Sequence, residues 1–387
     1  MNIGIFTDTY YPEVNGVANS TYQLKKALEE LGHIVYVFTV SNPNVIEYEK
    51  NVIRMHSIPF IFLKDRRISY SLVSFWRKKI EKYNLDIIHT QTEFSLGHMG
   101  KRIARYLRIP MIHTYHTIYE DYTHYLKLPM NKSIRNVVKK LSRHCCDNAE
   151  CVIVPTDKVK NLLHSYNVKR DIIVQPTGIE LDKFTNIDFL HVEQLKKKYN
   201  ISDSDNTMIY VGRLAEEKNL KEIINFMPYI KEIDYNVKLI VVGSGPYRET
   251  LESCIEELKL ENNVIFTGSV PWENIQDYYA LGKVFISAST SETQGLTYIE
   301  ALATGRPILV RNDKCLEGVL QQGINGYGYS DLMQFIMYYK KLFLEGEYNI
   351  MAHNAVSSID AYSSKRFAQN IEEIYNLALT YYNRKVV

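Results

Sequence analysis

The chain has 387 residues, of which 45% are hydrophobic; this length predicts two domains of ordinary size, and this composition excludes a disordered chain. No apolar run approaches the ~18 residues of a membrane-spanning helix, and no internal repeat is present. The net charge of +2 divides unevenly, because residues 1–180 carry 25 Lys and Arg against 17 Asp and Glu, and the remainder carries 21 against 27. A basic half joined to an acidic half indicates an anionic partner, although a charge drift without function would give the same counts.

Short apolar runs alternate with amphipathic stretches from the first residues onward, and residues 1–8 lack the charged start and long apolar core of a signal peptide. Continuous Val/Ile runs are typical of buried parallel strands. In the first half we predict strands at 3–6, 34–40, 87–89, 111–114, 152–154 and 172–174. In the second half we predict strands at 208–211, 237–242, 264–266, 284–288 and 308–310.

Strands separated by helical patterns predict an α/β fold with two Rossmann-like, doubly wound domains. A turn-rich break at Gln175–Gly178 divides the chain into residues 1–176 and residues 177–363. A helix over about 364–387, with Ser363–Ser364 as its N-cap, is expected to pack back on the first domain. Ligands of such sheets bind beyond the carboxyl ends of the strands, so we expect the site in a cleft across which the two domains face.

Two segments of the first domain combine cations with apolar side chains. Residues 57–85 contain seven cations against two acidic residues, and Ile68 to Tyr83 has helical apolar spacing. This pattern predicts an interfacial helix on anionic lipid. The residues expected to contact the membrane are Phe60, Phe62, Lys64, Arg66, Arg67, Trp76, Arg77, Lys78 and Lys79. Residues 132–143 form a second such candidate; for each, a surface helix with a solvated basic face is the alternative.

The segment His113–Tyr125 follows a predicted strand and is dense in aromatic and titratable side chains. For His113 and His124 singly, a polar loop in which histidines satisfy backbone groups is the simpler interpretation. Nucleic acid is the other anionic partner to consider, and no signature of a nucleic-acid-binding module is present.

Four charged residues follow two strands of the second domain. Arg213 and Lys218 come after the strand at 208–211, and Glu292 and Glu300 after the strand at 284–288. Gly295 permits a tight turn before a helix that begins near 296–297 and ends at 305, and a helix N-terminus binds anions. Two cations, this helix end and two carboxylates suit a ligand with both a diphosphate and sugar hydroxyls, which is a nucleotide sugar. A glutamate pair alone fits a solvated helix face equally well.

No metal-binding motif stands at a strand end. Asp203–Asp205 lies in a polar turn, and we predict no essential metal. The five cysteines have no paired Cys-x-x-Cys spacing, so we expect reduced thiols in a cytosolic protein, without a zinc site.

The chain resembles the retaining glycosyltransferases of family 4, which have the two-domain GT-B fold. The motifs that carry the resemblance run along the whole chain: Asp8–Val17, Gly212–Lys218, Gly243–Pro246, Thr267–Gly268 and Glu292–Glu300. The family usually has a second glycine where this chain has Asn15. We attribute the exchange to the tolerance of Asn for left-handed conformations.

The resemblance implies roles for individual residues. Arg213 and Lys218 would bind the donor diphosphate, Glu300 the ribose and Glu292 the transferred sugar, with His116 beside that sugar. The implied catalytic residues are His116, Arg213, Lys218 and Glu292. The implied donor-binding residues are Gly16, Arg213, Lys218, Gly243, Gly268, Val270, Glu292, Gly295, Leu296, Thr297 and Glu300.

The His113–Tyr125 segment and the opening Ile3–Tyr10 are similar to those of diacylglycerol glucosyltransferases. This resemblance implies retaining transfer of glucose from UDP-glucose, a substrate rather than a cofactor, to diacylglycerol. The expected place of action is the cytoplasmic face of the cell membrane, with peripheral attachment. The alternatives are a soluble family 4 enzyme acting on a polysaccharide or small acceptor, a nucleotide-sugar 2-epimerase and an inactive lipid-surface scaffold. Glucose and galactose differ in the orientation of one hydroxyl, and the sequence does not distinguish between these two donor sugars.

Overall fold

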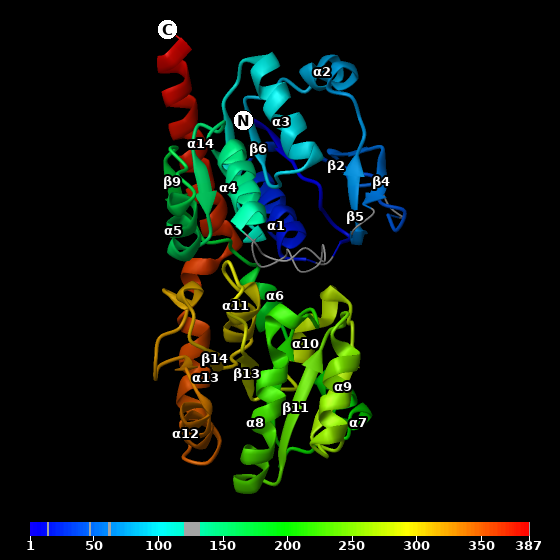
Figure 1. Ribbon diagram of the computed structural model, residues 1–387, viewed down its shortest axis with the longest axis vertical. Helices are drawn as coiled ribbons and strands as arrows, with labels where there is room; N and C mark the ends of the chain where they lie inside the picture. Colours follow the sequence, from blue (N-terminus) through cyan, green and yellow to red (C-terminus); the bar gives the residue numbers. More distant parts are fainter. Residues whose placement is uncertain (14, 46–47, 61–62, 120–131, 387) are drawn as a thin grey trace. The chain divides into compact units, whose positions relative to one another are not determined.

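The computed structural model describes residues 1–13, 15–45, 48–60, 63–119 and 132–386, with the backbone alone at 63–66, 132–134 and 385–386. The chain forms two compact units: an N-terminal unit of residues 1–178 with 364–387, and a C-terminal unit of residues 179–363 (Figure 1). Each unit contains a parallel sheet with helices on both faces, so the predicted pair of Rossmann-like domains is confirmed.

The N-terminal unit contains a seven-stranded sheet in the order β3-β2-β1-β6-β7-β8-β9, and every neighbouring pair is parallel. Its strands are β1 (Asn2–Phe6), β2 (Ile34–Val40), β3 (Val52–Met55), β6 (Ile87–Thr90), β7 (Met111–Thr114), β8 (Val152–Val154) and β9 (Ile172–Val174). Its helices are α1 (Gly16–Glu30), α2 (Val73–Glu81), α3 (Ser95–Leu107), α4 (Lys132–Cys146), α5 (Asp157–Ser165) and α14 (Ser364–Val386).

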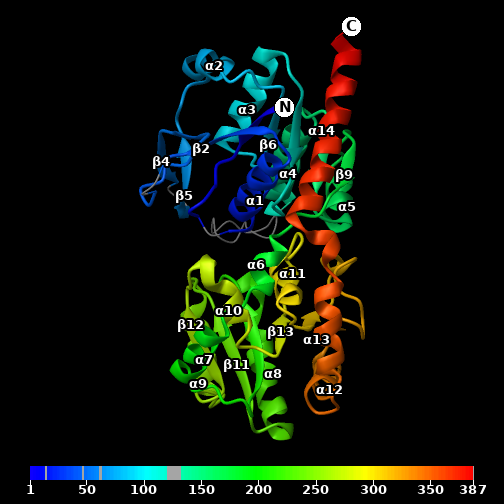
Figure 2. The ribbon, with the colours of Figure 1, turned by 180° about the vertical axis from the view of Figure 1, so that it is seen from behind.

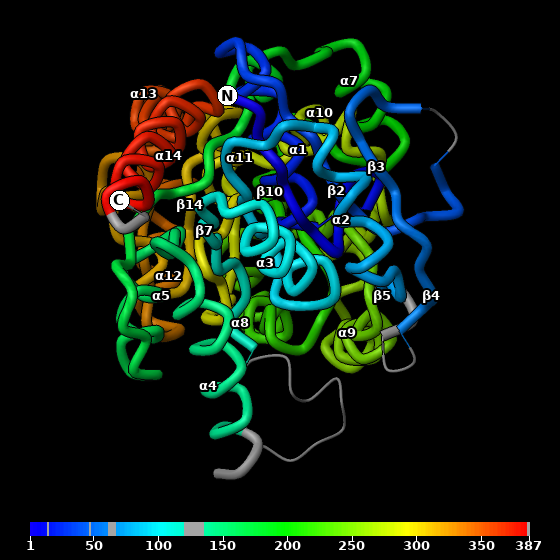
Figure 3. Tube along the Cα trace, turned by 90° about the horizontal axis from the view of Figure 1, so that it is seen from above, coloured from blue at the N-terminus to red at the C-terminus, as the bar shows by residue number. Residues whose placement is uncertain are grey.

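Two apolar layers cover this sheet. On one face, α1 packs beside the C-terminal helix α14, and Leu24 and Leu28 share a core with Ile371 and Tyr375 (Figure 2). On the other face, helices α2 to α5 pack against the sheet. The last helix of the chain is therefore part of the first unit, and Figure 3 shows this helix nearly end-on.

The helix predicted from the apolar spacing of Ile68 to Tyr83 is shorter in the structure, where α2 spans Val73–Glu81. Residues before it form an antiparallel hairpin of β4 (Ser57–Phe60) and β5 (Leu63–Ser69), in which Ile58 pairs with Ile68. The Arg67 guanidinium donates hydrogen bonds to Ser57 O at 2.8 Å and to Ser57 Oγ at 2.9 Å across the hairpin. The prediction of a helix from Ile68 was therefore wrong, since α2 begins at Val73 and Ile68 is a strand residue.

The C-terminal unit contains a six-stranded parallel sheet in the order β12-β11-β10-β13-β14-β15. Its strands are β10 (Asn206–Val211), β11 (Val237–Val242), β12 (Val264–Gly268), β13 (Val284–Ser287), β14 (Ile308–Arg311) and β15 (Gly326–Tyr329). Its α-helices are α6 (Leu181–Thr185), α7 (Phe189–Lys198), α8 (Leu220–Ile233), α9 (Arg248–Glu257), α10 (Ile275–Tyr279), α11 (Leu296–Ala303), α12 (Leu332–Phe343) and α13 (Tyr348–Ser357). Helices α8, α9 and α12 pack on one face of the sheet, and α6, α7, α10 and α11 on the other.

Candidate functional site

The carboxyl ends of β10 and β13 bring two predicted site residues together. The short 3-10 helix η2 (Glu216–Lys218) follows β10, and the loop with Glu292 follows β13. Lys218 Nζ lies 2.6 Å from Glu292 Oε1, and both side chains are about one-fifth exposed. This ion pair places a cation and a carboxylate next to each other at the edge of the sheet where parallel α/β folds bind their ligands.

The Arg213 loop is held by backbone contacts that only glycine permits. The phenol of Tyr210 donates a hydrogen bond to Arg213 O at 3.0 Å, and the Arg213 side chain is exposed. A Cβ atom on Gly243 would lie 2.0 Å from Gly212 O, and one on Gly245 would lie 2.2 Å from Leu214 O. The Gly243–Pro246 motif therefore packs the loop after β11 directly against the Arg213 loop.

The loop after β13 ends in a tight turn, as predicted. Gly295 has a φ of +74°, a left-handed conformation that disfavours side chains, and its missing Cβ would lie 2.4 Å from the Tyr298 ring. Helix α11 starts at the next residue, Leu296, so the N–H groups of its first turn, including that of Thr297, point out of the helix end. The left-handed Gly305 follows the helix. The predicted helix start and end are thus confirmed.

Glu300 is buried on α11 and accepts a hydrogen bond from the Tyr279 phenol at 2.7 Å. Burial raises the pKa of the Glu300 carboxyl, against an opposing effect of the Tyr279 hydrogen bond and of the Lys183 ammonium. Burial also lowers the pKa of Lys183 to about 8. The Lys183 ammonium donates to Trp272 O at 2.5 Å. Our reading of the sequence missed Lys183, which belongs to α6, far from Glu300 along the chain.

Two further residues of the implied donor-binding set, Gly268 and Val270, lie at the end of β12 and just beyond it. Gly268 has a φ of +77°, and no heavy atom lies within 4 Å of the position that its Cβ would occupy. Val270 is half-buried and packs against the core of this unit. This strand end is therefore open beside Gly268 and apolar beside Val270.

Two predicted site residues, Gly16 and His116, belong to the N-terminal unit. Gly16 is the first residue of α1, and its missing Cβ has no heavy atom within 4 Å. The preceding Asn15 has a φ of −157° and caps the helix by accepting a hydrogen bond from Ala18 N at 3.0 Å. Our attribution of Asn15 to a left-handed conformation was wrong, since the residue is extended and serves as an N-cap.

His116 follows β7 and lies 2.6 Å, through its Nε2 atom, from Gln91 Oε1. Burial, and the charge on His113 in its ionised form, lower the pKa of His116 to about 3, so the ring is neutral at physiological pH. His113 is a buried strand residue whose Nδ1 lies 2.8 Å from Thr90 Oγ1, rather than a loop residue. His124 lies outside the described residues.

The predicted membrane-contact residues have varied surroundings. Arg77, Lys78 and Lys79 are exposed on α2, while Trp76 and Phe60 are half-buried. Phe62 and the side chains of Lys64 and Arg66 lie outside the described residues.

The Lys79 ammonium lies 3.9 Å from the centroid of the Phe75 ring, which is 60% exposed. On the second candidate, α4, Val137 and Leu141 are exposed. Across the described part of the chain, no helix is both long enough and apolar enough to cross a membrane.

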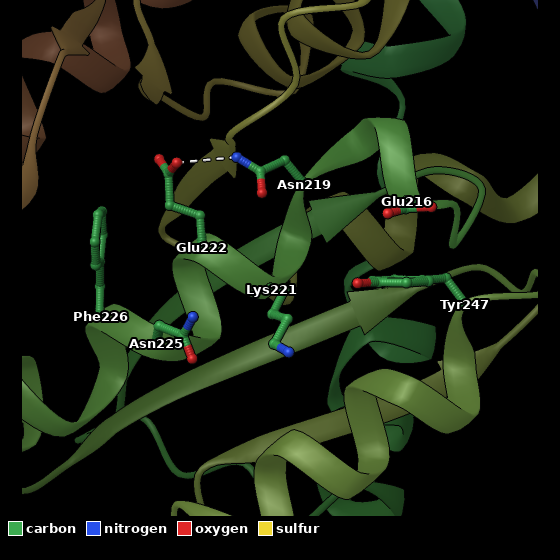
Figure 4. Close-up of a pocket in the computed structure, with 7 residues that line it drawn as sticks. All are labelled: Glu216, Asn219, Lys221, Glu222, Asn225, Phe226 and Tyr247. Carbon is green, nitrogen blue, oxygen red and sulfur yellow. Dashed lines mark hydrogen bonds between the residues drawn. The ribbon is translucent and has the colours of Figure 1, made fainter. Parts of the chain in front are cut away.

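Within the same described ranges, no group of three or more His, Cys, Asp or Glu side chains is placed to hold a metal ion. None of the five cysteines forms a disulfide. A groove of about 380 Å³ opens beside the first turns of α8 (Figure 4). It is lined by Glu216, Asn219, Lys221, Glu222, Asn225, Phe226 and Tyr247. None of the predicted site residues lines this groove, and its Glu216 belongs to the same short helix as Lys218.

Known proteins match the chain over nearly its whole length. The family described as Glycosyltransferase Family 4 matches residues 14–183, and that described as Glycosyl transferases group 1 matches residues 191–331. The chain is 41% identical over 383 residues to the alpha-monoglucosyldiacylglycerol synthase of Streptococcus pneumoniae, covering 97% of this chain and 85% of that one. It is 32% identical over 397 residues to the synthase of the same name from Acholeplasma laidlawii, covering 100% and 99%.

Solved structures share the fold at lower sequence identity. HepE from Anabaena, crystallised with UDP, superposes with a TM-score of 0.78 at 15% identity, covering 97% of this chain and 100% of that one. The sucrose-phosphate synthase of Thermosynechococcus elongatus superposes with a TM-score of 0.77 at 20% identity, covering 98% and 99%. The fold is therefore that of the GT-B glycosyltransferases, and the chain belongs to glycosyltransferase family 4.

Proposed function

We propose that the protein transfers glucose from UDP-glucose to the free hydroxyl of diacylglycerol, with retention of the anomeric configuration, to make a membrane glycolipid. The observation that carries the proposal is the Lys218–Glu292 ion pair beside the N-terminus of α11. It combines groups for a diphosphate and for sugar hydroxyls at one strand-end edge. Two synthases of such a glycolipid are 41% and 32% identical to the chain.

The donor roles follow from the chemistry of each side chain. Arg213 and Lys218 bind the diphosphate, and the N–H groups at the start of α11 add partial positive charge. Glu292 accepts hydrogen bonds from the transferred sugar, and Glu300 from the ribose diol. Gly16, Gly243 and Gly295 allow close backbone approach, and Gly268 with Val270 lies against the base.

Transfer breaks the bond between the anomeric carbon and the diphosphate oxygen and forms a bond from that carbon to the acceptor oxygen. The acceptor attacks on the face that the diphosphate leaves, and a diphosphate oxygen takes the hydroxyl proton. Arg213 and Lys218 stabilise the charge that develops on the leaving group, the role that a metal ion fills in other transferases. We propose that no metal is required. Neutral His116 hydrogen-bonds the sugar near the reacting carbon.

The lipid acceptor requires contact with a bilayer surface, and we propose that α2 supplies part of it on the cytoplasmic face of the membrane. Phe75 and Leu72 are exposed apolar side chains, and Arg77, Lys78 and Lys79 are exposed cations beside them. Apolar side chains next to cations on one short helix suit the interface of an anionic membrane.

This surface role makes a prediction for paired charge variants. Lys78→Ala/Lys79→Ala should weaken binding to anionic vesicles by roughly 30-fold, since each cation near such a surface contributes about 1 kcal/mol. The measurement is vesicle co-sedimentation as a function of anionic lipid content. The matched control is Lys197→Ala/Lys198→Ala, which removes two adjacent exposed lysines of α7. Equal losses in the two variants would show that binding follows net charge and not the α2 surface.

The proposed activity is tested with UDP-glucose labelled in the sugar and diacylglycerol in vesicles, without added metal. Labelled glycolipid is the expected product. Label in a soluble acceptor but not in lipid would favour a soluble transferase, and a changed nucleotide sugar without any acceptor product would indicate an epimerase. An inactive lipid-surface scaffold would give no turnover at all.

A further inference from the structure

A continuous chain of buried polar groups leads from His116 to the C-terminal helix. His116 Nε2 lies 2.6 Å from Gln91 Oε1, and Gln91 Nε2 lies 3.1 Å from His89 Nε2. His89 Nδ1 in turn lies 2.8 Å from the Tyr375 phenol oxygen. His89 belongs to β6, Gln91 follows this strand directly, and Tyr375 belongs to α14. His89 and Tyr375 are fully buried, and Gln91 is 2% exposed.

The orientation of the Gln91 amide fixes the direction of every hydrogen bond in this chain. A carbonyl oxygen only accepts, so His116 Nε2 carries a proton and donates it to Gln91 Oε1. The amide NH2 only donates, so His89 Nε2 is unprotonated and accepts through its lone pair. The Thr114 hydroxyl oxygen lies 2.6 Å from the same atom.

Both imidazoles are neutral, because burial lowers the pKa of His116 and, strongly, that of His89. Each ring therefore carries one proton. In His116 that proton is on Nε2, which leaves Nδ1 as an acceptor; in His89 it is on Nδ1, which donates to the Tyr375 oxygen.

We propose that Gln91, His89 and Tyr375 are positioning residues that hold His116 in the Nε2–H tautomer and so make its Nδ1 atom the acceptor for a sugar hydroxyl. The two tautomers of a neutral imidazole are close in stability, so the hydrogen-bond partners decide between them. The relevance to catalysis rests on the proposed role of His116. The tautomers themselves follow from the hydrogen-bonded chain together with the neutrality of both rings, and do not depend on that role.

The direct test is NMR of the full chain labelled with 15N in its histidines, with the His116→Gln and His89→Gln variants used to assign the signals. We expect the Nε2–H pattern for His116 and the Nδ1–H pattern for His89. Tyr375→Phe removes the oxygen that accepts from His89, so the His89 Nδ1–H tautomer loses its partner and the His116 signal changes as well. Gln91→Met breaks the chain beside His116 and should give both His116 tautomers.

The matched control is Tyr381→Phe, the same substitution at an exposed position of α14. It should leave both histidine signals unchanged. In the transfer assay, Tyr375→Phe should lower kcat by about three- to tenfold, the effect of one neutral hydrogen bond, while Tyr381→Phe should not.

An Nδ1–H tautomer for His116 in the unmodified chain, or a His116 signal unaffected by both Tyr375→Phe and Gln91→Met, would overturn the proposal. The NMR measurement needs neither donor nor acceptor. If the tautomers are as described and no glycolipid forms, the positioning chain stands and the proposed function fails. If glycolipid forms but the tautomers differ from those described, the positioning chain is refuted and the proposed function stands.

Discussion

Replacing Lys218 by alanine should lower kcat for glucosyl transfer by about a hundredfold or more. The variant loses a cation at the strand-end edge where negative charge develops as the diphosphate leaves, and removal of one such stabilising group costs this much in other enzymes. It also removes the ion pair with Glu292, so the proposed sugar-binding carboxylate loses its 2.6 Å contact. The loss should fall mainly on kcat, because the charge is largest in the transition state.

The measurement is steady-state kinetics with UDP-glucose and diacylglycerol vesicles. The control is Lys221→Ala, which removes an exposed lysine three residues further on, in the first turn of α8. It should leave kcat unchanged. If the two variants lost the same activity, the diphosphate role of Lys218 would be refuted.

Glu300→Gln should raise the KM for UDP-glucose by about tenfold or more and at the same time raise the melting temperature at neutral pH. The weaker binding follows from the loss of a charged acceptor for the ribose hydroxyls. The stabilisation follows from the raised pKa of the buried carboxyl. Between the unfolded and the folded pKa the native state binds the proton more tightly, so its stability falls as pH rises. Above the unfolded-state pKa the buried Glu300 carboxyl therefore costs the fold stability, and glutamine removes that cost.

Donor binding by the unmodified protein should depend on pH for the same reason. Donor affinity should fall as pH drops through the raised pKa of Glu300, and Glu300→Gln should abolish this dependence. Calorimetric titration of UDP and thermal unfolding across pH measure both effects. The control is Glu249→Gln, an exposed carboxylate in the first turn of α9, for which neither quantity should change. A Glu300→Gln variant that binds UDP normally would exclude the ribose role.

Most strands of both sheets could be predicted from the sequence, because each is a buried run rich in Val and Ile bounded by turn residues. We did not predict β3, whose short sequence Val-Ile-Arg-Met contains a cation. Such a run was absent in β15, whose sequence alternates glycine and tyrosine. Its Gly326 lies so close to β14 that a Cβ would be 2.2 Å from Ile308 O, so tertiary packing selects this strand. We missed the β4–β5 hairpin because Ile68 continues the helical spacing of the apolar residues that follow it, and this spacing predicted a helix from Ile68.

The places of some proposed donor-site residues in the fold could be predicted from the strand pattern, since Arg213 lies in the loop after β10 and Glu292 in the loop after β13. Their partners could not be predicted, because the contacts join positions far apart in sequence. Lys183 is close enough to Glu300 to affect its pKa. Tyr375, on the C-terminal helix, is hydrogen-bonded to His89. The role of Asn15 was misjudged, since a cap and a left-handed residue have similar amino-acid preferences.

The proposed activity is decided by NMR of the lipid that the unmodified protein forms from UDP-glucose and diacylglycerol. We expect one glucose joined through an α-linkage to the diacylglycerol hydroxyl, formed without added metal. A β-linked glucolipid would contradict retention, and a product that contains no diacylglycerol would contradict the proposed acceptor.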